Sequence, residues 1–174
     1  GRPVLEAIRK EYPGLRILLT FFSPPGYEVR KDYPGADHVC YLPLDTPANA
    51  RKFLDIVQPS LAIFIKYEFW VHYFQGMYSR KIPVILISGV FRHGQVFFKW
   101  YGGLFRGLLE RMDRLFVQNE ASLHLLHNHG IDQVTVAGDT RFDRVWQLRR
   151  HPVALPEIEK FITLENVLVG GSTW

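Results

Sequence analysis

Short apolar runs alternate with amphipathic segments along almost the whole chain, and the connections between them are short. The runs have the length and composition of strands, and the segments between them have apolar residues at helical spacing. This alternation is typical of βαβ units, in which a crossover helix returns the chain to a parallel neighbour. The sequence therefore predicts an α/β fold with a doubly wound, Rossmann-like parallel sheet. The expected strands span residues 16–22, 38–42, 61–68, 83–88, 114–118, 133–137 and 166–169.

The clearest helix prediction covers residues 95–112, where apolar side chains recur on one face. Further helices are expected at 27–33, 69–81 and 121–129, at the start of the chain up to Tyr12, and after a cap at Asp45 or Thr46. We expect residues 1–150 to form one domain, and residues 151–174 to form a linker and the start of a second. The predicted face of the 95–112 helix contains Phe97, Phe98, Tyr101, Leu104, Phe105, Leu108, Leu109 and Met112.

Composition and motifs exclude several classes of function. The chain has 174 residues and a net charge of +4, which permits contact with phosphates or an anionic membrane without requiring it. Cys40 is the single cysteine, so the sequence offers neither a disulfide framework nor a Cys-based metal site. No Walker loop, GxGxxG, GxSxG or HExxH motif is present, so ATPase, dinucleotide-binding, hydrolase and zinc-protease readings lose their support. His124 and His127 lie one helical turn apart and could bind a metal, although imidazoles at such spacing are more often surface or half-buried groups.

The apolar run from Leu61 to Ile65 ends in Lys66, Tyr67 and Glu68. Ligands of open α/β sheets bind beyond the carboxyl ends of the strands, which makes Glu68 a candidate for acid–base chemistry or for substrate stabilisation. The alternative is that Glu68 caps the helix that follows. Lys66 is a candidate partner of Glu68, because side chains two residues apart on a strand share a face.

Two further candidates also follow predicted strands. Arg141 lies beyond the strand at 133–137, where a guanidinium can neutralise a carboxylate or phosphate, or else pair with Asp139 or Asp143. The turn Ser23-Pro24-Pro25-Gly26 follows the first strand and is a candidate anion-binding loop, with Ser23 and Gly26 as acceptor-binding residues. As a motif this turn is weak, since most such turns have no ligand.

Residues 91–101 interleave aromatic rings with cations. Packing in the core accounts for Phe97, Phe98 and Tyr101, but not for Arg92, Lys99, Trp100 and Arg106. These four residues are predicted to contact an anionic membrane surface, with the ring at the interface and the cations at lipid phosphates. Nucleic acid is not expected, because no RNA-binding motif accompanies the segment. Gly102, Gly103 and Gly107 weaken a helix, so close packing is expected there.

Six short motifs, in order along nearly the whole chain, resemble the N-terminal domain of the Kdo transferases. Residues 66–70 are most similar to the Bacteroidetes branch. These enzymes pass 3-deoxy-D-manno-octulosonic acid from CMP-Kdo to the lipid A precursor. The matching stretches are Ser23-Pro24-Pro25-Gly26, Tyr41-Leu42-Pro43-Leu44-Asp45, Tyr67-Glu68-Phe69-Trp70, Gln118-Asn119-Glu120, Gly138-Asp139-Thr140-Arg141-Phe142-Asp143 and Gly171-Ser172-Thr173-Trp174.

The resemblance implies the acceptor-binding half of a two-domain GT-B glycosyltransferase, at the cytoplasmic face of the bacterial inner membrane. It implies inversion at the anomeric carbon without a metal or a cofactor, and CMP-Kdo bound mainly by a following domain. Glu68 matches a carboxylate, and Arg141 a position usually held by lysine, that the family uses to stabilise the transition state. Arginine keeps the charge but changes the geometry. Pro25 stands where many members have threonine, which removes a donor from the acceptor loop.

The family's general base is a glutamate in a Ser-Leu-Gly-Glu motif, expected shortly before Gly1 together with the first strand of the sheet. The sequence has no such motif. We therefore expect the 174-residue chain alone not to transfer sugar. Two other readings stay open: another GT-B transferase or sugar epimerase, and a non-catalytic module that binds anionic glycans or lipids.

Overall fold

A computed structural model describes residues 2–66, 69–139, 142, 145 and 149 of the chain. The chain forms two compact units, residues 1–140 and 141–174. In the second unit the described residues Phe142 and Val145 are exposed. The predicted domain boundary at residue 150 and the predicted strand at 166–169 lie outside the described residues, so both stay predictions.

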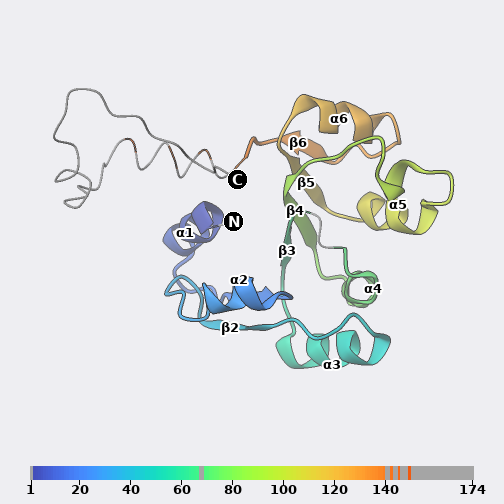
Figure 1. The fold of residues 1–174 in the computed structure, drawn as a ribbon. Helices are drawn as coiled ribbons and strands as arrows, with labels where there is room; N and C mark the ends of the chain where they lie inside the picture. Colours follow the sequence, from blue (N-terminus) through green and yellow to red (C-terminus); the bar gives the residue numbers. More distant parts are fainter. Residues whose placement is uncertain (1, 67–68, 140–141, 143–144, 146–148, 150–174) are drawn as a thin grey trace, which may run out of the picture. The chain divides into compact units, whose positions relative to one another are not determined.

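Helices and strands alternate along the first unit in the predicted order (Figure 1). The strands are three to six residues long, and the longest is β4, in the four-stranded sheet. The elements are α1 (Arg2–Glu11), β1 (Leu18–Phe21), α2 (Pro24–Glu28), β2 (His38–Tyr41), α3 (Pro47–Val57), β3 (Ala62–Ile65), α4 (Val71–Ser79), β4 (Val84–Gly89), the 3₁₀ turn η1 (Val96–Phe98), α5 (Gly103–Glu110), β5 (Arg114–Val117), α6 (Glu120–His127) and β6 (Val134–Val136).

Every strand pair among the described residues is parallel, which confirms the predicted α/β class with parallel strands. The strands do not form one continuous sheet. β1 pairs with β2 in a two-stranded sheet, and β3, β4, β5 and β6 form a four-stranded sheet in that order. The single sheet expected from the sequence is thus divided between β1 and β3.

The hydrophobic core gathers around the four-stranded sheet. Strands β4 and β5 and helices α4, α5 and α6 supply most of the fully buried side chains. In contrast, no described residue before Ala50 is buried, although α1 has a distinct apolar face. The fully buried residues of the core are Leu54, Tyr73, Phe74, Val84, Leu86, Leu109, Leu115, Val117, Leu126 and Ile131.

The side chain of Asp37 connects α1 to the start of β1. Asp37 Oδ2 accepts hydrogen bonds from the Ile17 N–H at 2.7 Å and from Arg9 Nη2 at 2.6 Å. The Ile17 N–H, and next to it the Arg9 guanidinium, hold the pKa of the Asp37 carboxyl below its usual value. Since the Arg9–Asp37 ion pair is largely exposed to solvent, it contributes little to the free energy of folding.

The predicted helix at 95–112 is wrong as a single element. The chain forms η1, then bends, and α5 begins only at Gly103. The bend turns Tyr101 and Leu104 outward, so these two residues do not share the buried face of Leu108, Leu109 and Met112. The local apolar spacing could not reveal this bend, because it depends on a contact between Gly102 and the backbone of Val96.

Two other boundaries differ from the sequence prediction. The short helix expected at 27–33 lies at Pro24–Glu28, because the two prolines fit the first turn, where no helical N–H is needed. The strand expected at 61–68 ends at Ile65, because Lys66 adopts a left-handed backbone conformation with φ of 64°. Lys66 therefore lies outside β3, and its predicted pairing with Glu68, which lies outside the described residues, stays a prediction.

Candidate functional site

Polar residues follow several strands at their carboxyl ends. Ser23 comes after β1, Lys66 after β3 and Gln118 after β5, while Ser88 is the second-last residue of β4. The carboxyl ends of parallel strands meet at the same edge of a sheet, which is where open α/β folds bind ligands. The carboxyl ends of β3, β4 and β5 share one edge of the four-stranded sheet, and the end of β1 belongs to the two-stranded sheet. These strand ends form the candidate site, and their part in binding stays a prediction.

The backbone is strained at two adjacent strand ends. Lys66 has φ of 64° and Ser88 has φ of 55°, and both residues carry a Cβ that disfavours this conformation. The Lys66 N–H donates a 3.0 Å hydrogen bond to the Ile87 carbonyl, so the two strained residues are linked across β3 and β4. Such strain costs on the order of 1–3 kcal/mol per residue and clusters at functional sites.

Gln118 holds the end of β4 in this conformation. Its Nε2 donates to the Ser88 carbonyl at 3.1 Å, and its backbone N–H donates to the Gly89 carbonyl at 2.8 Å. The pairing of β4 with β5 shifts register between Leu86 and Gly89, as expected when an irregularity re-aims a strand end. Sequence reasoning placed Gln118 in a family motif but gave it no role.

A second polar contact holds the loop after β4. The buried Ser122 Oγ accepts from the Phe91 N–H at 2.8 Å and lies 2.8 Å from Asn119 Oδ1. Asn119 Oδ1 also accepts from the Ser122 N–H at 2.9 Å, which caps α6. Side chains from the start of α6 thus fix the loop that leads from the candidate site to the aromatic segment.

We expect Ser122→Ala to lower the free energy of unfolding by about 1–3 kcal/mol, because it leaves the buried Phe91 N–H without an acceptor. Urea denaturation followed by circular dichroism measures the change. Ser79→Ala is the control, since its hydroxyl bonds the Gly76 carbonyl on an exposed helix end. A loss for Ser122→Ala no larger than the loss for Ser79→Ala would contradict the assigned role.

Asp45 caps a helix other than the one expected. Thr46, the other predicted candidate, caps α3, with its Oγ1 accepting from the Asn49 N–H at 3.2 Å. Asp45 Oδ1 instead accepts from the N–H groups of His72 and Tyr73, at 3.1 and 3.2 Å. These are first-turn donors of α4, so α4 has a capping carboxylate 27 residues upstream in the chain.

The Asp45 cap weakens the alternative hypothesis that Glu68 caps the helix that follows it. The capping hypothesis required Glu68 to satisfy the N-terminal N–H groups of α4, and Asp45 already accepts from two of them. Next to this cap, Tyr73 donates its hydroxyl to the Pro43 carbonyl at 3.0 Å, and burial, with the Asp45 charge as a smaller cause, raises the pKa of Tyr73 to about 12. Tyr73 is therefore a neutral donor at physiological pH.

The two residues predicted to carry the chemistry, Glu68 and Arg141, lie outside the described residues. Their mutual position stays a prediction. Among the described residues, Trp70 follows closely after position 68, and its ring packs against Phe22 with centroids 4.6 Å apart. Its Nε1 is buried, and no described group accepts its hydrogen bond.

The turn after β1 offers fewer donors than a helix N-terminus normally does. Ser23 is the exposed N-cap residue of α2, but its hydroxyl makes no cap hydrogen bond. Pro24 and Pro25 have no N–H, and the Tyr27 N–H already donates to the Ser23 carbonyl at 3.2 Å. A Cβ on Gly26 would lie 2.9 Å from the Phe21 ring, so this glycine allows the turn to pack on β1.

The aromatic segment and the start of α5 carry three exposed large hydrophobic side chains. Trp100 is 93% exposed, Tyr101 62% and Leu104 58%, and the Trp100 and Tyr101 rings are 5.5 Å apart. Arg92 is exposed and Lys99 half-buried, while Arg106 lies 3.6 Å from Glu110, which offsets part of its charge. The expected close packing holds for Gly102 but not for Gly103 and Gly107, beside which the space is open.

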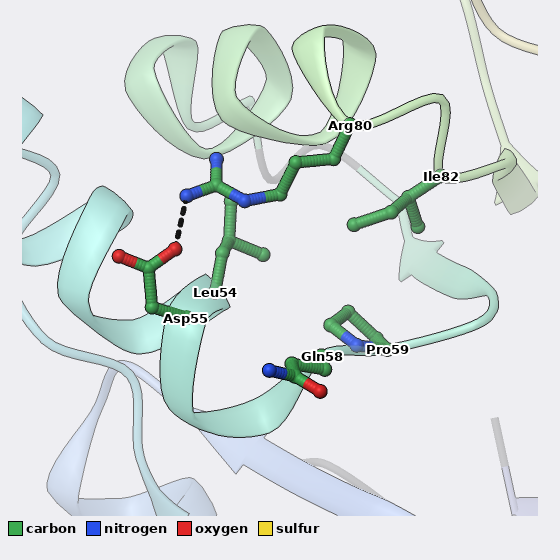
Figure 2. A pocket seen from close by; sticks show the side chains of 6 residues that line it. All are labelled: Leu54, Asp55, Gln58, Pro59, Arg80 and Ile82. Atoms are coloured by element: carbon green, nitrogen blue, oxygen red, sulfur yellow. Dashed lines mark hydrogen bonds and ion pairs between the residues drawn. The ribbon is translucent and has the colours of Figure 1, made fainter.

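A hollow of about 460 Å³ lies between the ends of α3 and α4 (Figure 2). Asp55 and Arg80 form an ion pair at one side of it. Gln58 and Pro59 lead into the amino end of β3, and Ile82 leads into β4. The hollow is thus at the sheet edge opposite the candidate site, and it contributes nothing to the chemistry proposed there.

The described part of the chain offers neither a cluster of metal ligands nor a membrane-spanning helix. In residues 2–66 and 69–139, no three His, Cys, Asp or Glu side chains come together in a way that would hold a metal ion. Nor does any helix there reach the length and apolarity that crossing a bilayer requires.

Comparison with known proteins gives one consistent result. The chain is 33% identical to a 3-deoxy-D-manno-octulosonic acid transferase of Haemophilus influenzae, over 49% of this chain and 20% of the relative. It is 26% identical to the Aquifex aeolicus protein of the same name, over 80% of this chain and 36% of the relative. For the Rickettsia felis protein of that name, the identity is 28% over 98% of this chain and 37% of the relative.

The chain therefore spans between a fifth and about two fifths of the length of these relatives. Residues 1–144 match the protein family described as 3-deoxy-D-manno-octulosonic-acid transferase (kdotransferase). This match includes every described element of the parallel α/β unit and the strand ends that form the candidate site. The chain belongs to the family of Kdo transferase N-terminal domains.

Proposed function

We propose that this chain is the acceptor-binding half of an enzyme that transfers Kdo from CMP-Kdo to the lipid A precursor in lipopolysaccharide biosynthesis. The observation that carries the proposal is the family match over residues 1–144, in which Ser23 follows β1, Leu42 follows β2 and Gln118 follows β5 at their carboxyl ends. The donor CMP-Kdo is then bound mainly by a following domain. No cofactor is needed, because the nucleotide is itself the leaving group.

The proposed reaction is a single displacement with inversion. An acceptor hydroxyl oxygen attacks the anomeric carbon of Kdo and loses its proton to a base. The bond from that carbon to the phosphate oxygen of CMP breaks, and CMP leaves with the electron pair. Glu68 and Arg141 are proposed to stabilise the charge that develops, as electrostatic groups at a strand edge commonly do. Lys66, Ser23 and Gly26 are proposed to contact the anionic acceptor.

In the full-length protein, we expect Glu68→Gln to lower kcat/KM for Kdo transfer by roughly 100-fold, because the substitution removes one charge at constant size. Transfer from CMP-Kdo to the lipid A precursor is the measurement. Glu11→Gln, an exposed carboxylate of α1, is the matched control and should leave kcat/KM unchanged. Arg141→Lys should retain more activity than Arg141→Gln, since it keeps the charge.

Full activity of the Glu68→Gln enzyme would exclude a catalytic role for this residue. A full-length protein that binds the acceptor and transfers no sugar would instead indicate a binding module. The 174-residue chain alone is expected not to turn over CMP-Kdo, and turnover by it would contradict that expectation.

We further propose that the surface formed by Arg92, Lys99, Trp100, Tyr101, Leu104 and Arg106 rests on an anionic membrane, at the cytoplasmic face of the inner membrane. An exposed apolar surface that is flanked by cations fits the interface of an anionic bilayer. The lipid acceptor resides in such a bilayer, so this contact would hold the acceptor side of the enzyme at its substrate.

We expect Trp100→Ala to weaken binding to vesicles of phosphatidylcholine with anionic phosphatidylglycerol by at least about tenfold, because burial of a large apolar side chain contributes about 1.5–3 kcal/mol. Flotation measures the bound fraction. Tyr12→Ala is the control, because Tyr12 is as exposed as Tyr101 and lies outside the proposed surface. Lys99→Gln should weaken binding only to the anionic vesicles. Equal binding of the Trp100→Ala and Tyr12→Ala variants would exclude the membrane contact.

A further inference from the structure

Two residues at the carboxyl edge of the four-stranded sheet have strained backbones that no helix end explains. Among the described residues, four that are not glycine have a positive φ. Gln58 is the C-cap of α3 and Lys81 directly follows the C-cap of α4, positions where helices commonly take a left-handed residue. Lys66 and Ser88 lie instead at the ends of β3 and β4. Strain of this kind persists only where the surrounding contacts impose it, and it points to a function of the strained segment.

The contact that imposes the conformation of Ser88 comes from a side chain. Between Leu86 and Gly89, β4 advances by three residues while β5 advances by two, so β4 has one extra residue before its end. The extra residue of such a bulge is left out of the regular ladder. In this interval the Ser88 carbonyl accepts from Gln118 Nε2 at 3.1 Å. Because Ser88 is buried, the Gln118 amide is a costly donor to lose.

The end of β4 is also hydrogen-bonded to the end of β3. The Lys66 N–H donates to the Ile87 carbonyl at 3.0 Å. That carbonyl belongs to the planar peptide group between Ile87 and Ser88, so its orientation changes with the φ angle of Ser88. The ends of three neighbouring strands thus form one connected row, with Gln118 after β5, Ser88 in β4 and Lys66 after β3 (Figure 1).

We propose that Gln118 is a positioning residue for the transfer reaction. Its amide keeps Ser88 in the left-handed conformation, and the peptide group between Ile87 and Ser88 then holds the backbone of Lys66 in the conformation that directs its side chain to the anionic acceptor. The proposal rests on the proposed function, in which Lys66 contacts the acceptor. Gln118 needs no contact with a substrate, because it acts through the backbone of two neighbouring strands.

The size of the effect follows from the hydrogen bond. Loss of one neutral hydrogen bond shifts a conformational equilibrium by about 3- to 10-fold. A ligand that needs the disfavoured conformation loses affinity in proportion to the fraction of the protein that still adopts it. Only the acceptor is expected to lose affinity, because CMP-Kdo is proposed to bind mainly to a following domain.

In the full-length protein, we expect Gln118→Met to raise KM for the lipid A precursor about 3- to 10-fold and KM for CMP-Kdo by less than about twofold. Methionine has nearly the length of glutamine but no N–H to donate. Steady-state transfer, with each substrate varied in turn, is the measurement. Gln118→Glu, in which a carboxylate oxygen replaces the donor, is the second variant and should raise the acceptor KM at least as much.

Gln133→Met is the matched control. Gln133 Nε2 also donates to backbone carbonyls, those of Leu109 at 3.1 Å and Glu110 at 3.0 Å, but Gln133 lies at the amino end of β6. Its loss should lower stability and leave both KM values unchanged. Equal effects of Gln118→Met and Gln133→Met on the acceptor KM would overturn the proposal.

Substitution of Ser88 separates positioning from general destabilisation. Glycine adopts a positive φ without strain, so in a Ser88→Gly background Gln118→Met should change the acceptor KM by less than about twofold. Alanine keeps the strain and, like glycine, lacks the hydroxyl, so in a Ser88→Ala background the effect of about 3- to 10-fold should remain. The same factor in both backgrounds would contradict a role through the conformation of Ser88.

Amide hydrogen exchange tests the connected strand ends without any measurement of sugar transfer. In the full-length protein, we expect Gln118→Met to speed exchange of the Lys66 N–H about 3- to 10-fold and Gln133→Met to leave it unchanged. Unchanged exchange at Lys66 in the Gln118→Met protein would refute the proposal, even in a fully active enzyme. Faster exchange in a protein that transfers no Kdo would refute the proposed function alone and would support the role of Gln118 at the strand ends.

Discussion

Gly102→Ala is expected to lower the free energy of unfolding by at least about 3 kcal/mol. A Cβ at this position would lie 1.7 Å from the carbonyl oxygen of Val96 and 2.8 Å from its carbonyl carbon. Both are backbone atoms of η1, so no side-chain rotation relieves the clash. The bend between η1 and α5 would have to open, which would disturb the packing of Phe97 in the core.

Gly107→Ala is the matched control for this prediction. Gly107 lies inside α5, and apart from its chain neighbours and the nearby backbone of α5 no atom lies within 4 Å of the position of an added Cβ. Alanine there should raise the free energy of unfolding by about 0.5–1 kcal/mol, because glycine has a poor helix propensity. Urea denaturation of the two variants side by side measures both changes. Similar stabilities of the two variants would show that the contact of Gly102 with Val96 does not constrain the bend.

Phe74→Ala should lower the free energy of unfolding by about 3–5 kcal/mol, the range measured for large buried aromatics. Phe74 has no exposed surface, and its ring stacks on Phe64 of β3 with centroids 4.4 Å apart. It also contacts Phe69 and Tyr78, so the cavity would be lined by rings whose backbones belong to separate elements. Such a site collapses poorly, which places the expected cost at the upper end of the range.

Ile56→Ala provides the comparison on a neighbouring helix. Ile56 lies in α3 and is 72% exposed, so its truncation should change the free energy of unfolding by less than about 0.5 kcal/mol. Thermal denaturation of both variants checks the difference. If Phe74→Ala cost no more than Ile56→Ala, the core would not be centred on the contact of α4 with β3.

The contacts at the sheet edge give the family motifs a physical role. The motif that contains Gln118 and Asn119 supplies the amide that holds Ser88 and the cap that holds Ser122. The motif that ends in Asp45 supplies the cap of α4. Sequence reasoning could have found Ser88 by the rule that selected Glu68, since both residues come at the carboxyl end of an apolar run. The left-handed backbone conformation of Ser88 could not be predicted from the sequence, because such positions are usually recognised by a glycine and Ser88 is not one.

The sequence by itself determined the α/β class, the order of the elements and the parallel strands, because apolar periodicity is a local property that each segment carries. Tertiary contacts decided the rest. The break of the 95–112 segment depends on the approach of Gly102 to Val96, and the role of Asp45 depends on a helix that begins 26 residues further along the chain. The division of the sheet between β1 and β3 likewise became visible only from which strands pair. Each of these features depends on contacts that form only when the chain folds. The local pattern of residues therefore does not predict them.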